Sequence, residues 1–153
     1  MSKNEFTIRA AVEADADALY GLMTDLGYQQ LSLAEFGDTF AAVLRHPEMI
    51  LLVAEAASGR VVGLASISHR PQLRLAGTLA TIDELVVADV MRGCGVGKAL
   101  LEEAKRAASR LNARRLELET NRARDSYRRQ FYIKNGFFEA DSAVMRIDPE
   151  LPT

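Results

Sequence analysis

The stretch from Val86 to Lys98, VVADVMRGCGVGK, decides how this chain folds and what it binds. An apolar run leads to Arg92, and glycines at alternate positions 93, 95 and 97 then lead into the helical pattern ALLEEA at 99–104. Glycine lets a backbone turn tightly and bring its N–H groups close to a ligand. A helix N-terminus adds unpaired N–H groups and the positive end of the helix dipole, which both favour an anion. The stretch is therefore interpreted as a phosphate-binding loop.

Spacing excludes two common phosphate-binding loops. A P-loop has four residues between its first glycine and the Gly-Lys pair, followed by Ser or Thr. Here three residues separate Gly93 from Gly97, and Ala99 follows Lys98. A dinucleotide loop requires the pattern G-x-G-x-x-G, and the last step from Gly95 to Gly97 is too short for it. These differences argue against a nucleoside triphosphate site and against NAD or FAD.

The loop resembles the pyrophosphate-binding loop of the GNAT superfamily of acetyl-CoA-dependent N-acetyltransferases. That loop is written [RQ]-x-x-G-x-[GA] and is matched by Arg92, Gly95 and Gly97. Taken alone, the match also fits an ordinary strand-to-helix turn or a glycine cap. Two further segments favour the family: IDELVV at 82–87 resembles its splayed central strand, and FYIKNGF at 131–137 matches its F-Y-x-x-x-G-F segment.

The resemblance implies an α/β fold of the mixed α+β kind. We expect a mostly antiparallel sheet of six or seven strands with a parallel, splayed central pair and about four helices. A helix separates the last central strand from the next one, so these two strands should run parallel through a right-handed crossover. Periodicity and turn residues predict strands at 6–10, 49–54, 60–69, 78–87, 116–120, 137–139 and 143–147.

The helices are predicted from apolar periodicity and capping residues. The first starts near Ala16 and ends before Gly27, and the second starts at Ser32, where Ser32 and Glu35 form a capping-box pattern. A third spans 96–111. A fourth is expected from Asp125 or Ser126 through Lys134. Pro71 is expected to end the strand before it, which makes 71–77 a polar loop.

Length and composition predict one domain, 1–153, of a cytoplasmic protein. The chain has 153 residues, 48% hydrophobic and 26% charged, which suits a single globular core. Its net charge of −2 argues against a nucleic-acid partner. Its apolar runs are shorter than the roughly twenty residues of a membrane helix. One cysteine and two histidines indicate neither a disulfide framework nor a metal site.

The resemblance implies that acetyl-CoA is the acyl donor and assigns residues to it. Leu85, Val86 and Val87 are expected to contact the cofactor, because if the central strand splays after Leu85, the N–H groups of Val86 and Val87 become available to the pantetheine and to the acetyl oxygen. Asn121 is expected to hold pantetheine; its spacing to Tyr132 is longer than usual in the family, so Asp125 is the alternative. The residues expected to bind the pyrophosphate are Arg92, Gly93, Cys94, Gly95, Val96, Gly97 and Lys98.

Two side chains are candidates for proton transfer. Asp83 and Glu84 are adjacent, so strand alternation sends them to opposite faces; we favour Glu84 as the base, with a salt bridge to a basic residue of 60–74 as the structural alternative. Tyr132 is the candidate acid, because in the family this tyrosine lies beside the thioester sulfur and a phenol is protonated at neutral pH. Its alternative role is only to orient CoA. Cys94 has no histidine near it in sequence, so we expect direct attack by the amine in a ternary complex.

The acceptor is not defined by any diagnostic pattern. In the family, its site is walled by the two N-terminal helices, and the 70–77 loop is a second candidate wall. A small-molecule primary amine is slightly favoured over a protein or peptide amine, because no groove for an extended peptide is indicated. A noncatalytic acyl-CoA-binding or sensing module is a further alternative, and a homodimer stays open.

Overall fold

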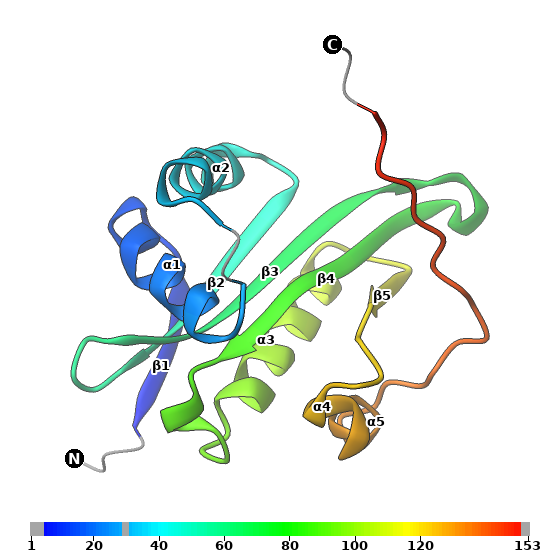
Figure 1. Cartoon of the computed structure of the whole chain (residues 1–153). Helices are drawn as coiled ribbons and strands as arrows, with labels where there is room; N and C mark the ends of the chain where they lie inside the picture. Colours follow the sequence, from blue (N-terminus) through cyan, green and yellow to red (C-terminus); the bar gives the residue numbers. More distant parts are fainter. Residues whose placement is uncertain (1–4, 29–30, 151–153) are drawn as a thin grey trace. The chain divides into compact units, whose positions relative to one another are not determined.

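The computed structural model describes residues 5–28 and 31–150. The chain divides into two compact units, residues 1–119 and 120–153. In the first unit, five strands form one sheet in the order β1-β2-β3-β4-β5 (Figure 1). The first three pairs are antiparallel, and β4 and β5 run parallel as predicted. The strands are β1 (Phe6–Ala10), β2 (Met49–Ala56), β3 (Val61–Gln72), β4 (Gly77–Val87) and β5 (Arg115–Leu118).

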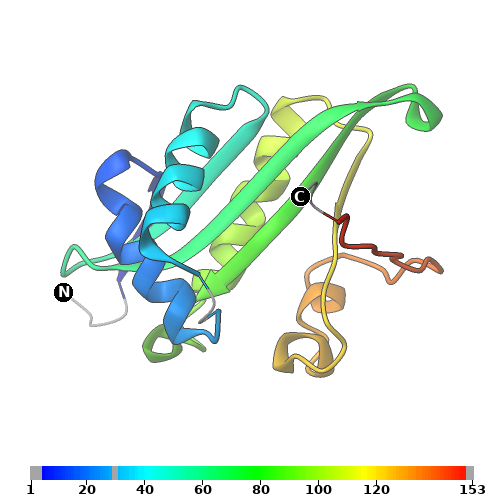
Figure 2. The ribbon, with the colours of Figure 1, turned by 45° about the horizontal axis from the view of Figure 1, so that its top comes forward.

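Helices cover both faces of this sheet (Figure 2). Helices α1 (Ala16–Asp25) and α2 (Leu33–Arg45) lie on one face, and α3 (Val96–Arg110) lies on the other. The predicted caps are present, because the Ser32 hydroxyl accepts a hydrogen bond from the Glu35 N–H at 3.0 Å and Gly27 has a φ of +99°. Among the described residues, no helix combines the length and the hydropathy that crossing a membrane requires.

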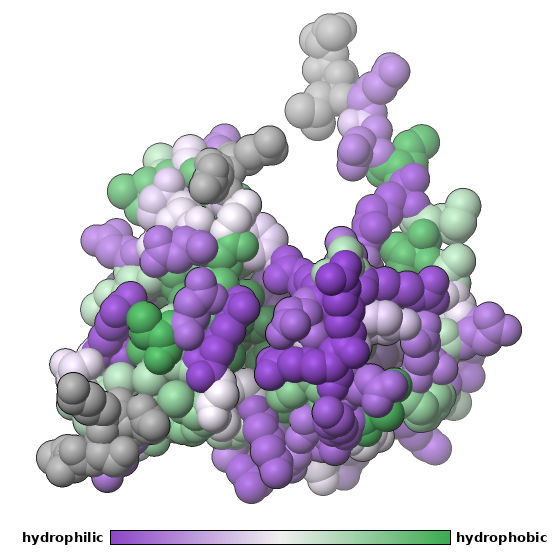
Figure 3. Space-filling model, turned by 60° about the horizontal axis from the view of Figure 1, so that its bottom comes forward, coloured by the Kyte–Doolittle hydropathy of each residue, from purple (hydrophilic) through white to green (hydrophobic). Residues whose placement is uncertain are grey.

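The core of the first unit lies between α3 and the sheet and beneath α1. On α3, the predicted apolar stripe is buried at positions 100, 101, 104, 107 and 108. A Cβ atom at Gly63 would lie 3.0 Å from both Leu100 Cδ1 and Val96 Cγ1, so the glycine lets α3 approach β3 closely. Hydrophilic residues cover much of the face seen in Figure 3, with smaller hydrophobic areas between them. The mixed surface agrees with the nearly balanced charge of the chain.

The strand β3 continues through Pro71, at which the sequence predicts an end. Pro71 pairs with Thr78, and the hairpin closes through the 3₁₀ turn Leu73–Leu75. The His69 N–H faces the β2 side, where it donates to the Glu48 carbonyl at 3.0 Å. Alternation along the strand points the Pro71 nitrogen to the same side, beyond the last residue that pairs with β2. The missing N–H therefore costs no ladder hydrogen bond.

The second unit departs from two further predictions. The expected helix to Lys134 is split into α4 (Asp125–Arg128) and α5 (Phe131–Lys134) by Gln130, whose φ is +59°. This turn stacks the Arg129 guanidinium over the Phe131 ring at 5.6 Å. The terminal hairpin is not formed, so the described residues contain five strands instead of six or seven. A short isolated hairpin is marginally stable, and its apolar residues Phe138, Val144, Met145 and Ile147 are exposed.

An ion-pair network fixes the entry to α1. The Arg9 guanidinium donates to both carboxylate oxygens of Asp15 at 2.8 Å and to Glu55 at 2.6 Å. The Val12 N–H also donates to Asp15, at 2.8 Å. The Asp15 side chain is only 7% exposed, and the hydrogen bonds from Arg9 hold the pKa of Asp15 below its ordinary value. The network therefore ties α1 to β1 and β2.

We predict that Asp15→Asn lowers the free energy of unfolding by about 2 kcal/mol at pH 7, because a mostly buried charged pair loses one partner. Since the folded pKa of Asp15 is lowered, its contribution is complete above the ordinary aspartate pKa and disappears as the pH falls through the folded pKa. Urea unfolding at pH 7 and at pH 3 measures both effects. Asp17→Asn, at an exposed position in the first turn of α1, is the control and should stay within about 0.5 kcal/mol of wild type.

Candidate functional site

The central pair of strands separates halfway along β4. The parallel pairing begins at Leu79 and Arg115 and ends at Ile82 and Leu118. Beyond Ile82, β4 continues to Val87 and is paired with β3 alone. The strands thus part three residues before Leu85, the point expected from the sequence. The β5 side of the last part of β4 is left without a strand neighbour in the first unit.

A β-bulge lies where the strands part. The register of β3 and β4 shifts between the pair Ile67–Ile82 and the pair Ser66–Glu84, so Asp83 is the extra residue. The Glu84 N–H donates to Ser66 Oγ at 3.1 Å and, four residues on, the Ala88 N–H donates to the Val62 carbonyl at 2.8 Å. Amides 84, 86 and 88 therefore face β3 by alternation.

The bulge decides which amides face the open side of β4. By the same alternation, the N–H groups of Leu85 and Val87 point away from β3, toward the side that β5 has left. The N–H of Val86, which the sequence predicts to be released as well, faces its register partner Leu64 in β3. Of the three residues expected to contact the cofactor, Leu85 and Val87 therefore present an N–H group to this edge, and Val86 does not. The N–H groups of Leu85 and Val87, two residues apart, are therefore aligned along this edge of β4.

The bulge also changes the placement of the two carboxylates. Asp83 and Glu84 are both exposed, so the expected alternation does not bury one of them. The Ser66 hydroxyl donates a hydrogen bond to Glu84 Oε2. The surrounding protein raises the pKa of Glu84, and the negative charge of Asp83 raises it further. Within residues 60–84, all of which the structure describes, no ion pair joins Glu84 to an arginine.

The loop after β4 exposes the start of α3. Gly93 and Gly95 have φ values of +78° and +85°, and a Cβ atom at either would meet nothing within 4 Å. The first hydrogen bond of the helix runs from the Ala99 N–H to the Gly95 carbonyl at 3.0 Å. The three N–H groups before it, at 96, 97 and 98, have no acceptor inside the helix. This geometry suits an anion.

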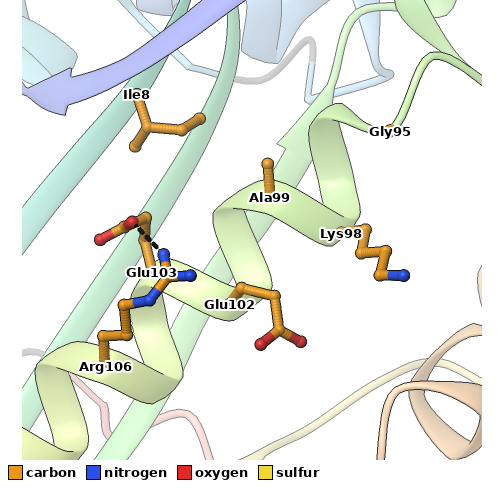
Figure 4. A pocket seen from close by; sticks show the side chains of 7 residues that line it. All are labelled: Ile8, Gly95, Lys98, Ala99, Glu102, Glu103 and Arg106. Atoms are coloured by element: carbon orange, nitrogen blue, oxygen red, sulfur yellow. Dashed lines mark hydrogen bonds and ion pairs between the residues drawn. The ribbon is translucent and has the colours of Figure 1, made fainter.

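The contacts of Met91, Arg92 and Cys94 hold the beginning of this loop. Met91 is buried, and the exposed Arg92 pairs with Asp89 at 3.0 Å. The Cys94 N–H donates to the Met91 carbonyl at 3.2 Å. Lys98 projects from the first turn of α3, away from the ion pair of Glu103 and Arg106 (Figure 4). A surface hollow of about 290 Å³ starts at this turn and is lined by Ile8, Gly95, Lys98, Ala99, Glu102, Glu103 and Arg106.

The remaining predicted residues lie in the second unit. The Tyr132 ring contacts Phe131 and Phe137 with centroids 5.1 and 6.1 Å apart, both edge-on. Burial raises the pKa of the Tyr132 phenol, and the charge of Arg124 opposes that shift. Asn121 Oδ1 accepts the Ala123 N–H at 2.8 Å, so this oxygen stabilises the turn before α4. Asp125, the alternative pantetheine ligand, pairs with Arg129 at 3.5 Å.

Sequence reasoning missed Ser66. The signal was a single hydroxyl in the otherwise apolar run VVGLASI at 61–67. The Ser66 hydroxyl contacts Glu84, which lies 18 residues away in the chain. This contact exists only because of the register in which β3 pairs with β4. That register includes the bulge, which apolar periodicity does not predict.

Comparisons with known proteins agree with this geometry. Residues 15–137 match the acetyltransferase (GNAT) family. Over 131 residues, 85% of this chain and 83% of the relative, the sequence is 36% identical to an aminoalkylphosphonate N-acetyltransferase of Salmonella typhimurium. A solved transcriptional regulator from Bacillus halodurans has a TM-score of 0.85 at 24% identity, covering 94% of this chain and 99% of its own. A putative acetyltransferase from Agrobacterium tumefaciens has a TM-score of 0.81 at 29% identity, covering 93% and 99%.

The family match covers the first unit from α1 onward and continues through Phe137 in the second. It includes the parted strands, the glycine loop and the start of α3. The relative from Salmonella typhimurium covers more than two thirds of the chain at an identity above 30%. This chain therefore belongs to the GNAT family of acetyltransferases and is an N-acetyltransferase that uses acetyl-CoA.

Proposed function

We propose that this enzyme acetylates the primary amine of a small molecule that carries an anionic group, with an aminoalkylphosphonate as the first candidate. The observation that carries the CoA part of the proposal is the glycine loop before α3, in which Arg92, Gly93 and Gly95 are exposed, with the N–H groups of residues 96–98 that have no acceptor inside the helix. The acceptor class is supported by the 36% identical relative, which is named for an aminoalkylphosphonate. A protein amine is the second candidate, and the acceptor experiment below separates the two.

In this proposal, the loop holds the CoA diphosphate. The N–H groups of residues 96–98 and the positive end of the α3 dipole attract the anion, and Arg92 and Lys98 add positive charge. Gly93, Cys94 and Gly95 form the turn, and the positive φ of both glycines keeps backbone close to the ligand. The amides of Leu85 and Val87 then supply donors to pantetheine and to the acetyl oxygen, whose negative charge grows as the amine attacks.

Glu84 is the proposed base. An amine acceptor is an ammonium ion at neutral pH and must lose a proton before its nitrogen can attack the thioester carbon. The raised pKa of Glu84 brings the carboxylate closer to the pKa of the group that it deprotonates, through a water molecule. Asp83 adds a second negative charge beside it and favours a cationic acceptor. The released proton is carried by Glu84 or by water.

Tyr132 is the proposed acid. When the amine nitrogen bonds to the acetyl carbon, the C–S bond breaks and CoA leaves as a thiolate that needs a proton. A phenol with a raised pKa is protonated at neutral pH and can donate. This role rests on the match of 131–137 to the family segment, together with the protonation state of the phenol. Asn121, or Asp125 in its place, remains the proposed pantetheine ligand.

The acceptor is tested with a panel of amines. We predict that 2-aminoethylphosphonate is acetylated with a kcat/KM at least about tenfold above that of a primary amine of equal length that lacks the phosphonate. Release of the CoA thiol measures turnover. Faster acetylation of a peptide amine would support the protein-amine candidate. Acetyl-CoA binding without turnover of any amine would indicate a noncatalytic module and contradict the proposed function.

The two proton-transfer roles are tested by substitution. Glu84→Gln and Tyr132→Phe should each lower kcat about a hundredfold, with little change in the KM for acetyl-CoA. Because the pKa of Glu84 is raised, wild-type kcat/KM should increase with pH to a point above the ordinary glutamate pKa, and Glu84→Gln should lose that dependence. The control for Tyr132→Phe is Tyr127→Phe, which removes a phenol of α4 that donates to Glu139 at 2.8 Å. Asp83→Asn distinguishes the two adjacent carboxylates. A greater loss in Asp83→Asn than in Glu84→Gln would reassign the base to Asp83.

The loop is tested with two glycines of nearly equal backbone conformation. Gly95 has a φ of +85° and Gly59, in the turn between β2 and β3, has a φ of +86°; a Cβ atom at either meets nothing within 4 Å. Gly95→Ala and Gly59→Ala should therefore lose similar stability, about 1 kcal/mol. Only Gly95→Ala should raise the KM for acetyl-CoA, by about tenfold or more. Equal KM values in the two variants would exclude the loop as the diphosphate site.

A further inference from the structure

The buried hydroxyl of Ser66 forms two hydrogen bonds with a single residue of the opposite strand, Glu84. Ser66 is 4% exposed and lies between Ala65 and Ile67, which are both fully buried. Its oxygen accepts the Glu84 N–H at 3.1 Å, and its proton goes to Glu84 Oε2. Because the backbone N–H occupies the hydroxyl oxygen, the hydroxyl proton is directed at the carboxylate.

We propose that Ser66 is a positioning residue for Glu84, whose hydroxyl fixes the carboxylate at the bulge and stabilises its ionised form. The proposal rests on the proposed role of Glu84 as the base. Ser66 itself does not reach substrate in this account, because it is buried and acts through Glu84. The bulge is essential to the arrangement, since it is the extra residue Asp83 that brings Glu84 opposite Ser66.

Opposing influences act on the Glu84 carboxyl. Partial desolvation by the surrounding protein and the charge of Asp83 disfavour its ionised form. A hydroxyl that donates to the carboxylate favours that form. Among the described residues, Asp83 on β4 is the charged group that acts on Glu84; on the β2 side, Ser66 is paired with Leu51, which is uncharged. Ser66 thus limits how far the pKa of Glu84 rises.

The experiment compares Ser66→Ala with Ser68→Ala. Ser68 lies two residues along β3 on the same face, but its partner in β4 is Thr81, before the bulge. The pKa of the Glu84 carboxyl is measured by NMR on protein with ¹³C-labelled glutamate, with Glu84→Gln to assign the signal. We expect Ser66→Ala to raise this pKa by about one unit, because a hydrogen bond to a charged group is lost. The rising limb of kcat/KM against pH should shift by the same amount, and Ser68→Ala should leave both unchanged.

An unchanged Glu84 pKa in folded Ser66→Ala would overturn the proposal, and so would an equal shift in Ser68→Ala. Thermal unfolding checks that the variants are folded. If Ser66→Ala does not fold, Ser66→Cys decides, since a thiol has a similar volume and is a weak donor; it should shift the pKa in the same direction. The NMR measurement does not depend on activity. Full activity of Glu84→Gln would therefore contradict the proposed base, while the titration would still decide whether Ser66 controls the carboxyl.

Discussion

The β-bulge at Asp83 is the constraint on which the rest of the candidate site depends. One extra residue in β4 changes which amides face β3, and so turns Leu85 and Val87 toward the side that β5 leaves open. Both carboxylates at the bulge, Asp83 and Glu84, are exposed. The irregularity therefore positions the edge donors and places the carboxylate that we propose as the base opposite Ser66.

The bulge is effective because the strand around it is held firmly. The segment β4 pairs with β3 over its whole length, and α3 packs closely on β3 at Gly63, where a methyl group would meet Leu100 and Val96. The same close packing fixes the start of α3 at the end of β4. The loop between them is short, and Met91 is buried within it. The sheet and α3 thus hold the edge amides and the helix start, where we propose that the diphosphate binds, in one arrangement.

The sequence predicts those parts of the fold and site that depend on neighbouring residues. Ser32 caps α2, Gly27 ends α1, and the glycine loop leads into α3, because each signal lies within a few positions of its effect. Predictions failed where distant pairing decides. Pro71 stays in β3 because β2 has already ended on its side, and the hairpin after Phe137 does not form because its residues meet no partner strand. The bulge and the Ser66–Glu84 contact likewise depend on a register between strands.

The local distribution of charge, and not the net charge of the chain, explains how an enzyme of net charge −2 can bind two ionic reactants. The diphosphate of the donor is an anion, and the proposed acceptor brings an ammonium group. The carboxylates of Asp83 and Glu84 lie at the bulge, and the positive end of the α3 dipole lies beyond Val87. The segment of β4 from Glu84 to Val87 therefore runs from a negatively charged region to a positively charged one. From Glu84 to Val87 the strand extends about 10 Å. Along this interval, the donors of Leu85 and Val87 lie between the region that attracts the amine and the region that attracts the diphosphate. An amine that attacks an acetyl group bound there would approach from the side of the two carboxylates. The order of charged and hydrogen-bonding groups along β4 therefore explains the side from which the amine attacks.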